Sequence, residues 1–219
     1  ELQELRVRQE ADQQAALGIL VDLESPLREE GLQLFFNQWK NESIVLNKWF
    51  ALQAHSTPLQ TFADVKRLMT HPSFDLKNPN RVYALLRTFG DNHSQFHGTD
   101  LSTYAFVADQ VLAIDKFNPQ VAARIAGAFD VWTKLPEKNR TAAHAELSRL
   151  LKSGLSSNTH EIIAELFRAM DTKIDDRAKA KIRPYADSFP YVNGGLFTKR
   201  NEVPKFSRIA RSYLVNAGS

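Results

Sequence analysis

The 219 residues are 43% hydrophobic and 24% charged, a composition typical of a globular protein with a sizeable core. The absence of Cys excludes disulfides and thiolate metal sites, and no apolar run approaches the roughly 18 residues of a membrane span. The polar residues 1–10 do not resemble a signal peptide, so we expect a cytoplasmic protein with no membrane partner.

The net charge of +3 is unevenly distributed along the chain. Residues 1–170 hold 18 Lys and Arg against 20 Asp and Glu, whereas residues 171–219 hold 10 against 5. All of the net positive charge therefore comes from the last 49 residues. This change in composition indicates that the chain has two parts.

Helix start signals recur along the first part. Three capping residues each precede a proline: Thr57-Pro58, Asn78-Pro79 and Asn118-Pro119. Proline suits the first helical position, where its missing N–H is not needed, so we expect all three prolines in first helical turns. Glycines at Gly90 and Gly154 indicate helix ends.

Apolar residues between these signals recur at helical spacing, as do Val82, Leu85, Leu86 and Phe89. The pattern predicts an all-α fold, an irregular α-solenoid-like stack of antiparallel helix pairs without a fixed-period repeat. The predicted helices lie near 3–21, 27–39, 42–54, 59–70, 79–89, 101–115, 119–133, 137–152 and 157–170.

The last part of the chain is predicted to be a short hairpin-and-helix appendage. Two apolar runs flank an Asn-Gly-Gly turn within residues 189–197, and a basic helix follows near 204–216. Its cations would either contact a nucleic-acid phosphate backbone or form a solvated helix face, and the second interpretation is the simpler one. These residues are Lys199, Arg200, Lys205, Arg208 and Arg211.

No complete catalytic or metal site is recognisable. A zinc peptidase needs two His at i and i+4 with a Glu beside the first, but His160-Glu161 is followed by Ala164 at the second ligand position. His93 and His97 have that spacing within a polar loop, where we expect His97 to hydrogen-bond the backbone. We assign no catalytic residue and no metal ligand.

Four short motifs, in this order, resemble the C-terminal helical domain of aminopeptidase N, a bacterial zinc aminopeptidase. The resemblance covers about residues 17–158, so we delimit a helical domain at 1–165. The motifs are Leu-Asn-Lys-Trp-Phe-Ala-Leu-Gln-Ala at 46–54, Asn-Pro-Asn-Arg at 78–81, Phe-His at 96–97 and Asn-Pro-Gln-Val-Ala-Ala-Arg at 118–124.

The resemblance implies a non-catalytic domain that packs on the catalytic domain of the same enzyme and encloses its peptide substrate. The zinc is then expected in that catalytic domain, with no cofactor in this chain. Arg124 matches an arginine that lines the substrate chamber in the family. Tyr83 departs from the family pattern, which often has Arg at this position.

Residues 166–219 resemble a different family, the DNA methyltransferases of single-chain restriction–modification systems, through Leu-Phe-Arg-Ala-Met-Asp-Thr at 166–172, the 189–197 segment and Pro-Lys-Phe-Ser-Arg at 204–208. Neither a Gly-rich cofactor loop nor an Asn-Pro-Pro-aromatic segment is present. Three hypotheses therefore stand: an aminopeptidase helical domain, a methyltransferase fragment or chimeric fusion with a DNA-contacting tail, and a helical-repeat scaffold for protein partners.

Overall fold

The computed structural model describes residues 2–169; residue 1 and residues 170–219, including the predicted appendage, lie outside the described part. Within 2–169 every regular element is helical. The α-helices are α1 Leu2–Leu20, α2 Pro26–Trp39, α3 Ser43–His55, α4 Thr61–Met69, α5 Pro79–Val82, α6 Thr88–Asp91, α7 His93–Phe96, α8 Ser102–Asp115, α9 Pro119–Ala126 and α10 Glu137–Leu151. A π-helix η1 spans Tyr83–Arg87, 3₁₀ turns η2 and η3 span Gly127–Phe129 and Trp132–Lys134, and residues 157–169 are helical.

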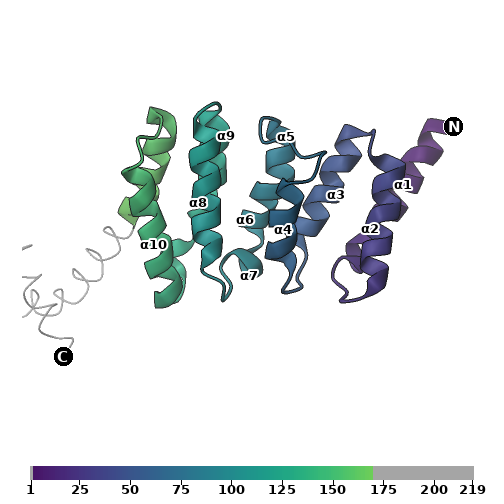
Figure 1. The fold of residues 1–219 in the computed structure, drawn as a ribbon, viewed down its shortest axis with the longest axis horizontal. Helices are drawn as coiled ribbons and strands as arrows, with labels where there is room; N and C mark the ends of the chain where they lie inside the picture. Colours follow the sequence, from purple (N-terminus) through teal and green to yellow (C-terminus); the bar gives the residue numbers. More distant parts are fainter. Residues whose placement is uncertain (1, 170–219) are drawn as a thin grey trace, which may run out of the picture. The chain divides into compact units, whose positions relative to one another are not determined.

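The helices of residues 1–167, one compact unit, stand side by side in chain order from α1 to α10 (Figure 1). Short connections join α1 to α2, α3 to α4 and α8 to α9, and the two members of each pair are packed together. This arrangement confirms the predicted all-α, solenoid-like stack. Among the described helices, none is both long and apolar enough to cross a membrane.

A chain of aromatic rings forms the core of the middle of the stack. Phe62 of α4 stacks on Phe89 of α6 with ring centroids 5.5 Å apart, and Phe89 meets Phe96 of α7 edge to face at 6.0 Å. Phe96 in turn contacts Phe129 of η2 at 5.6 Å. Because aromatic pairs add about 0.5–1.5 kcal/mol beyond their buried area, these contacts join α4, α6, α7 and η2 into one core.

A buried arginine holds the first two helix pairs together. Arg28 of α2 is 3% exposed and donates through Nη2 to Asp64 Oδ2 of α4 at 2.7 Å. Its Nε donates to the Val21 carbonyl in the α1–α2 turn at 3.1 Å. The guanidinium thus uses its fixed fork of donors to fix three segments at once.

Two of the three predicted cap–proline pairs are confirmed. The Asn78 side chain accepts from the backbone N–H of Arg81, and Asn118 accepts from that of Val121, each ahead of a proline at the helix start. The prediction for Pro58 is wrong, since α4 begins three residues later.

The reason for this difference lies in the partner of the capping residue. Both the backbone N–H and the hydroxyl of Thr57 donate to Asp22 Oδ1, at 2.8 and 3.2 Å. The Thr57 side chain therefore ties the chain to the α1–α2 connection instead of capping a helix. Pro58 lies in the turn before α4, where its carbonyl accepts from the Thr61 N–H.

Two glycines have different roles in the stack, one after a helix and one inside a helix. Gly154 has φ +69° and follows α10, which confirms the predicted helix end. Gly90, predicted to end a helix, lies inside α6, where an added Cβ would be 2.6 Å from the Ala128 Cβ. This glycine serves close packing between α6 and η2.

Two other predicted boundaries are corrected. The helix predicted at 119–133 ends at Ala126, where the chain changes to 3₁₀ turns from Gly127 onward. Part of the connection interpreted as a loop forms the short helix α7, which buries Phe96. Local propensity is weak in these short segments, and packing decides their conformation.

The helix at 157–169 is joined to the preceding elements by side-chain hydrogen bonds. Asp115, at the end of α8, accepts from the backbone N–H of Ser156 at 2.7 Å and from its hydroxyl at 2.5 Å. Trp132 Nε1 donates to the Leu166 carbonyl at 2.9 Å. These contacts join this helix, as far as Leu166, to the preceding elements of the stack.

Candidate functional site

Tyr83, Arg87 and Arg124 line an open cavity of about 370 Å³. Tyr83 and Arg87 are the first and last residues of the π-helix η1, and Arg124 lies in the last turn of α9. Arg124 is 37 positions from Arg87 and 41 positions from Tyr83 in the chain, and the fold brings the three residues together. We refer to these three residues as the Arg124 cluster.

The π-helix η1 places Tyr83 and Arg87 at the cavity. Leu85 and Leu86 within it are fully buried, whereas Tyr83 and Arg87 are half-buried. The Thr88 N–H donates to the Tyr83 carbonyl, the i+5 pattern of a π-turn. Such turns are rare in α-helices and frequently occur at functional sites.

Arg124 is an exposed guanidinium that rests on an aromatic ring. Its Nη1 donates to the Tyr83 hydroxyl at 3.3 Å, and its central carbon lies 5.6 Å from the Tyr83 ring centroid. Within residues 2–169 no carboxylate forms an ion pair with Arg124. Arg124 therefore brings to the cavity a guanidinium that has no ion-pair partner within the described residues.

Arg87 is fixed more firmly than Arg124. Its Nη1 donates to the Arg124 carbonyl at 2.8 Å, and its Nε to Asp91 Oδ2 at 3.1 Å. The guanidinium approaches the chain closely at Gly127, where an added Cβ would lie 2.6 Å from Nη1. Glycine at this position is what allows Arg87 to bridge η1 and α9.

The sequence predicted Arg124 as a site residue by resemblance, and it marked Tyr83 as a departure from the family pattern. Arg124 was expected to line a substrate chamber, and that role stays a prediction. Arg87 was missed, because no motif marks it and its position depends on the π-turn. The predicted nucleic-acid contacts all lie outside the described residues: Lys199, Arg200, Lys205, Arg208 and Arg211.

A second polar group surrounds His97, where the expected backbone contact is replaced by a side-chain contact. His97 Nδ1 lies 3.1 Å from the Tyr104 hydroxyl, which also accepts from Asn139 Nδ2 at 3.2 Å. Burial, with a smaller effect of nearby His93, lowers the pKa of His97 to about 4. A neutral His97 held among aromatic rings has a structural role.

The histidines of the described part do not form a zinc site. Within residues 2–169 no three His, Asp or Glu side chains are grouped so that they could hold a metal ion. At the single helical position that resembles a metallopeptidase motif, Ala164 stands where the second His would be needed. We therefore derive no catalytic step through a metal in this chain.

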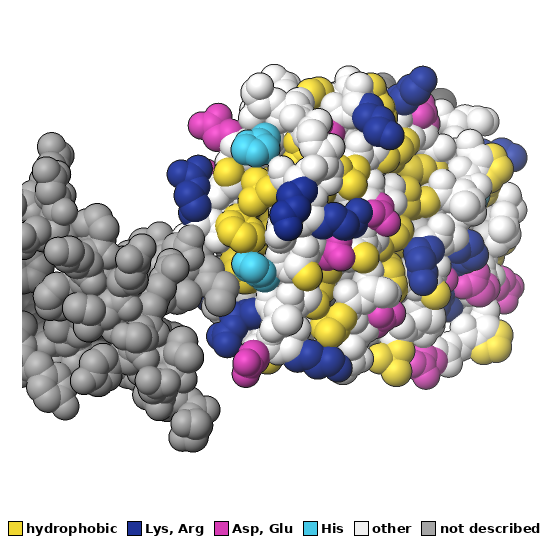
Figure 2. Space-filling model, turned by 60° about the vertical axis from the view of Figure 1, so that its left-hand side comes forward, with side chains coloured by type: hydrophobic (Ala, Val, Ile, Leu, Met, Phe, Trp, Pro, Cys, Tyr) yellow, Lys and Arg dark blue, Asp and Glu magenta, His cyan; other side chains and the backbone are white. Residues whose placement is uncertain are grey.

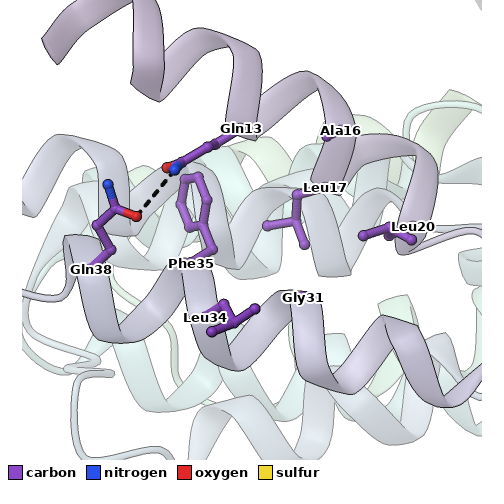
Figure 3. A pocket seen from close by; sticks show the side chains of 8 residues that line it. All are labelled: Gln13, Ala16, Leu17, Leu20, Gly31, Leu34, Phe35 and Gln38. Atoms are coloured by element: carbon purple, nitrogen blue, oxygen red, sulfur yellow. Dashed lines mark hydrogen bonds between the residues drawn. The ribbon is translucent and has the colours of Figure 1, made fainter.

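An apolar pocket of about 210 Å³ lies between α1 and α2 (Figure 3). Leu17, Leu34 and Phe35 are among its lining residues, and a hydrogen bond of 3.1 Å from Gln13 Nε2 to Gln38 Oε1 closes one end. No charged group lines the pocket. Its lining offers hydrophobic contact and no acid–base chemistry.

The surface charge on the face shown in Figure 2 is mixed. Lys and Arg side chains are interspersed there with Asp and Glu and with hydrophobic side chains. A nucleic-acid interface is expected to show clustered cations on one face. This face shows no such cluster.

The stack of helix pairs defines the class of protein as an ARM-like helical repeat. Residues 7–168 match the family described as "Domain of unknown function (DUF3458_C) ARM repeats". The match covers well over half of the 219 residues, and the chain belongs to this family.

Characterised relatives confirm the resemblance to the C-terminal helical domain of aminopeptidase N. The chain is 36% identical over 140 residues to aminopeptidase N of Caulobacter vibrioides, which covers 63% of this chain and 16% of the relative. It is 31% identical over 160 residues to aminopeptidase N of Escherichia coli, covering 73% and 18%. The chain thus spans less than a fifth of the length of these relatives.

A solved structure shows the same fold. The crystal structure of Legionella pneumophila aminopeptidase A in complex with aspartic acid is similar to this chain with a TM-score of 0.68 and 31% identity. The similarity covers 71% of this chain and 18% of that one. In that protein, the region similar to this helical stack is a small part of a much longer chain.

Proposed function

We propose that this chain acts as the helical domain of a cytoplasmic zinc aminopeptidase. In this role it packs on the catalytic domain of the same enzyme and forms a wall of the chamber that encloses the peptide substrate. The zinc and the general base belong to that catalytic domain. The observation that carries the proposal is the family match over residues 7–168, together with relatives named aminopeptidase N.

The Arg124 cluster supports a chamber-facing role for one side of the stack. An arginine without an anionic partner in the described part, beside an open cavity, is suited to contact something outside this domain. A scaffold function alone would not require such a group. Arg87 is held by hydrogen bonds to the Arg124 carbonyl and to Asp91, as expected for a wall that positions a substrate.

A domain exchange tests the proposal. The segment of the Caulobacter vibrioides aminopeptidase N that matches this chain is replaced by the corresponding 140 residues, and the product is compared with the enzyme lacking the segment. We expect the exchanged enzyme to hydrolyse amino-acid anilides well above the level of the deletion. Circular dichroism and zinc content serve as controls for folding and metal loading.

A folded, zinc-loaded exchange protein with no more activity than the deletion would refute the proposal. The isolated 219-residue chain is the second control. We expect it to hydrolyse no anilide and to bind no stoichiometric zinc, since Ala164 replaces a required ligand. One tightly held zinc per chain with chelator-sensitive activity would contradict this assignment.

A further inference from the structure

We propose that Arg81 is the centre of a docking surface that receives an Asp or Glu side chain from the catalytic domain of the same enzyme. The inference rests on the proposed function, which supplies that domain. It goes further in naming the contact surface on the helical stack and the chemical group that binds there. Arg81 lies in α5 and is not a member of the Arg124 cluster.

Arg81 is a buried cation whose guanidinium has no hydrogen-bond partner within residues 2–169. The side chain is only 5% exposed, and its Nη1 is fully buried without an acceptor. Nε and Nη2 donate to no described residue either. Such burial is costly, because water no longer solvates the N–H groups. Since native proteins rarely leave a buried donor unpaired, the acceptor is expected outside the described residues.

The charged groups nearest to Arg81 do not neutralise it. Burial, and then the charges of Arg67 and Arg81, lower the pKa of His71, so both guanidinium groups lie near this ring. Arg67 is paired with Asp64 at 3.0 Å, and the same carboxylate accepts from Arg28 at 2.7 Å. Asp64 is thus shared between two other arginines.

Asp75, in the connection before α5, does not supply the missing carboxylate. It is exposed, and its Oδ1 accepts from the backbone N–H of Lys77 at 2.9 Å. Burial lowers the pKa of Arg81, and no described carboxylate opposes this effect. A carboxylate paired with the guanidinium would favour its charged form and raise that pKa.

Aromatic rings surround the buried guanidinium. Arg81 lies with its central carbon 5.0 Å from the Phe50 ring centroid, and the His71 and Phe74 rings are each 5.9 Å from Phe50. Phe36 of α2 meets His71 edge to face at 5.0 Å. Phe50 is fully buried, whereas the other three rings are half-buried. We call Arg81 and these four rings the Arg81 surface. Arginine and aromatic residues are enriched at the energetically dominant centres of protein interfaces.

The remaining edge of the Arg81 guanidinium fits a carboxylate better than other anions. Only Nη1 is both enclosed and unpartnered, so Nε and Nη2 keep a small area in contact with solvent. These two nitrogens form an edge that binds both oxygens of a carboxylate through parallel hydrogen bonds. A single negative charge also neutralises the single guanidinium, which a doubly charged phosphate would exceed.

A carboxylate that belongs to a protein suits the Arg81 surface better than a free one. The half-buried rings are stabilised when further apolar side chains cover them, and a protein brings such side chains together with its carboxylate. The matched segment is only 16% of the Caulobacter vibrioides relative, so an enzyme of this kind has ample further surface. We therefore assign the carboxylate to the catalytic domain.

The first test measures carboxylate binding to the whole 219-residue chain by NMR of the arginine Nε–H groups. The probes are N-acetylglutamate methylamide, its neutral glutamine counterpart and inorganic phosphate. We expect the acid to shift the Arg81 signal and to bind at least about tenfold more tightly than the neutral probe, as a charge-assisted contact requires. Phosphate should bind more weakly than the acid.

Two variants accompany the probes. Arg81→Met removes the charge and keeps an apolar side chain, and it should abolish the preference for the acid, with the His71 ring signals as the readout. Arg8→Met removes an exposed arginine of α1 and should leave the shift of the Arg81 signal unchanged. Circular dichroism establishes that each variant keeps the helical content of the parent chain.

The second test compares the effect of Arg81→Met on thermal unfolding in two settings. In the isolated 219-residue chain an unpaired buried cation is replaced by an apolar side chain, so the midpoint should stay the same or rise. In the domain-exchange enzyme the same change leaves the partner's carboxylate buried and unpaired. There the midpoint should fall by about 3 °C or more.

Four results would overturn the inference. The first two are no preference for the acid at about 50 mM probe and tighter binding of phosphate. The third is a lower midpoint for Arg81→Met in the isolated chain, which would show that a buried water or another acceptor within this chain already pairs with Arg81. The fourth is an unchanged midpoint for the same variant in an active exchange enzyme.

The proposed function is judged separately, by the activity of the exchange enzyme that carries Arg81. An active enzyme combined with any of these four results rejects the Arg81 surface alone. An inactive enzyme rejects the proposed function and with it the catalytic domain as the source of the carboxylate. The NMR titration of the isolated chain then still decides whether Arg81 binds a carboxylate.

Discussion

At the scale of single residues, Gly90 shows how packing gives a residue a role that its position in the sequence does not reveal. The sequence indicates a helix end, whereas in the structure the residue lies inside α6 against Ala128, with room for no Cβ. In the sequence, a glycine that ends a helix cannot be told from a glycine that lets two elements pack closely. Only the contact with an element 38 positions away separates a helix end from a close approach.

Gly90→Ala is expected to lower the free energy of unfolding by about 1–3 kcal/mol through overpacking against Ala128. The matched control is Gly18→Ala in α1, where the added Cβ would be 3.6 Å from Leu52 Cδ2 and is tolerated. That control should be neutral or stabilising by up to about 1 kcal/mol, since alanine is the better helix former. Urea denaturation measures both.

The double variant Gly90→Ala with Ala128→Gly removes the clashing methyl group and should recover part of the loss. A full loss in the double variant would show that the clash with Ala128 is not the cause.

His97 is expected to titrate far below an ordinary histidine. Burial is the largest cause and lowers its pKa from 6.5 to about 4. Between these two values the unfolded chain binds a proton that the folded chain does not, so this histidine makes the chain less stable as pH falls from 6.5 toward 4. An NMR titration of the His97 ring should place its midpoint near 4.

Tyr104→Phe removes the hydroxyl next to His97 Nδ1 and serves as the control. Because burial dominates, the midpoint of this variant should stay well below 6.5. A midpoint near 6.5 in the parent chain would show that His97 is accessible to water.

At the scale of elements, the sequence predicts helices well and their interruptions poorly. Apolar spacing gives α2, α3, α8 and α10 to within about two residues, because each of these helices is 13 to 15 residues long and the local signal recurs over several turns. The π-turn at Tyr83–Arg87 and the 3₁₀ turn at Gly127–Phe129 have no local signal. Both occur where η1 meets α9, so contacts between them set their conformation.

The same limit explains the candidate site. Arg124 is marked by a family motif, but Arg87 and the shared cavity depend on the π-turn and on Gly127. Arg87 and Arg124, 37 positions apart, meet because η1 packs against α9. The pattern of helices in the sequence does not specify which helices pack together. A sequence-based prediction can therefore find one arginine and not the cluster.

Asn118→Ala is expected to lower the free energy of unfolding by about 1 kcal/mol, the usual effect of losing an N-cap. The Asn118 side chain accepts from the Val121 N–H at 3.2 Å, ahead of Pro119. Asn118→Asp keeps an acceptor and should be close to the parent in thermal unfolding. Equal loss in both variants would mean that Asn118 contributes through something other than its cap.

At the scale of the whole molecule, the helical stack should be independent of the last 50 residues. The family match ends at residue 168, and residues 1–167 form one compact unit. From the change in composition and the second resemblance, we expect residues from Asp171 onward not to have evolved against this core. The assignment of 166–219 as a separate part stays a prediction.

A chain ending at residue 169 is therefore expected to fold and to unfold at the same temperature as the 219-residue chain, to within about 2 °C. Limited proteolysis of the full chain should cut first between Asp171 and Pro190 and leave a stable helical fragment. A truncated chain that fails to fold would show that the two parts share one core.

The central claim is that this helical stack belongs to an aminopeptidase polypeptide whose catalytic domain precedes it. The most direct measurement is the sequence of the gene on both sides of the region that encodes these 219 residues. The claim predicts an upstream reading frame, continuous with this one, that encodes a Gly-Ala-Met-Glu-Asn substrate loop and a His-Glu-x-x-His helix. A continuous frame with no metallopeptidase motif upstream and an Asn-Pro-Pro-Tyr methyltransferase segment downstream would contradict it.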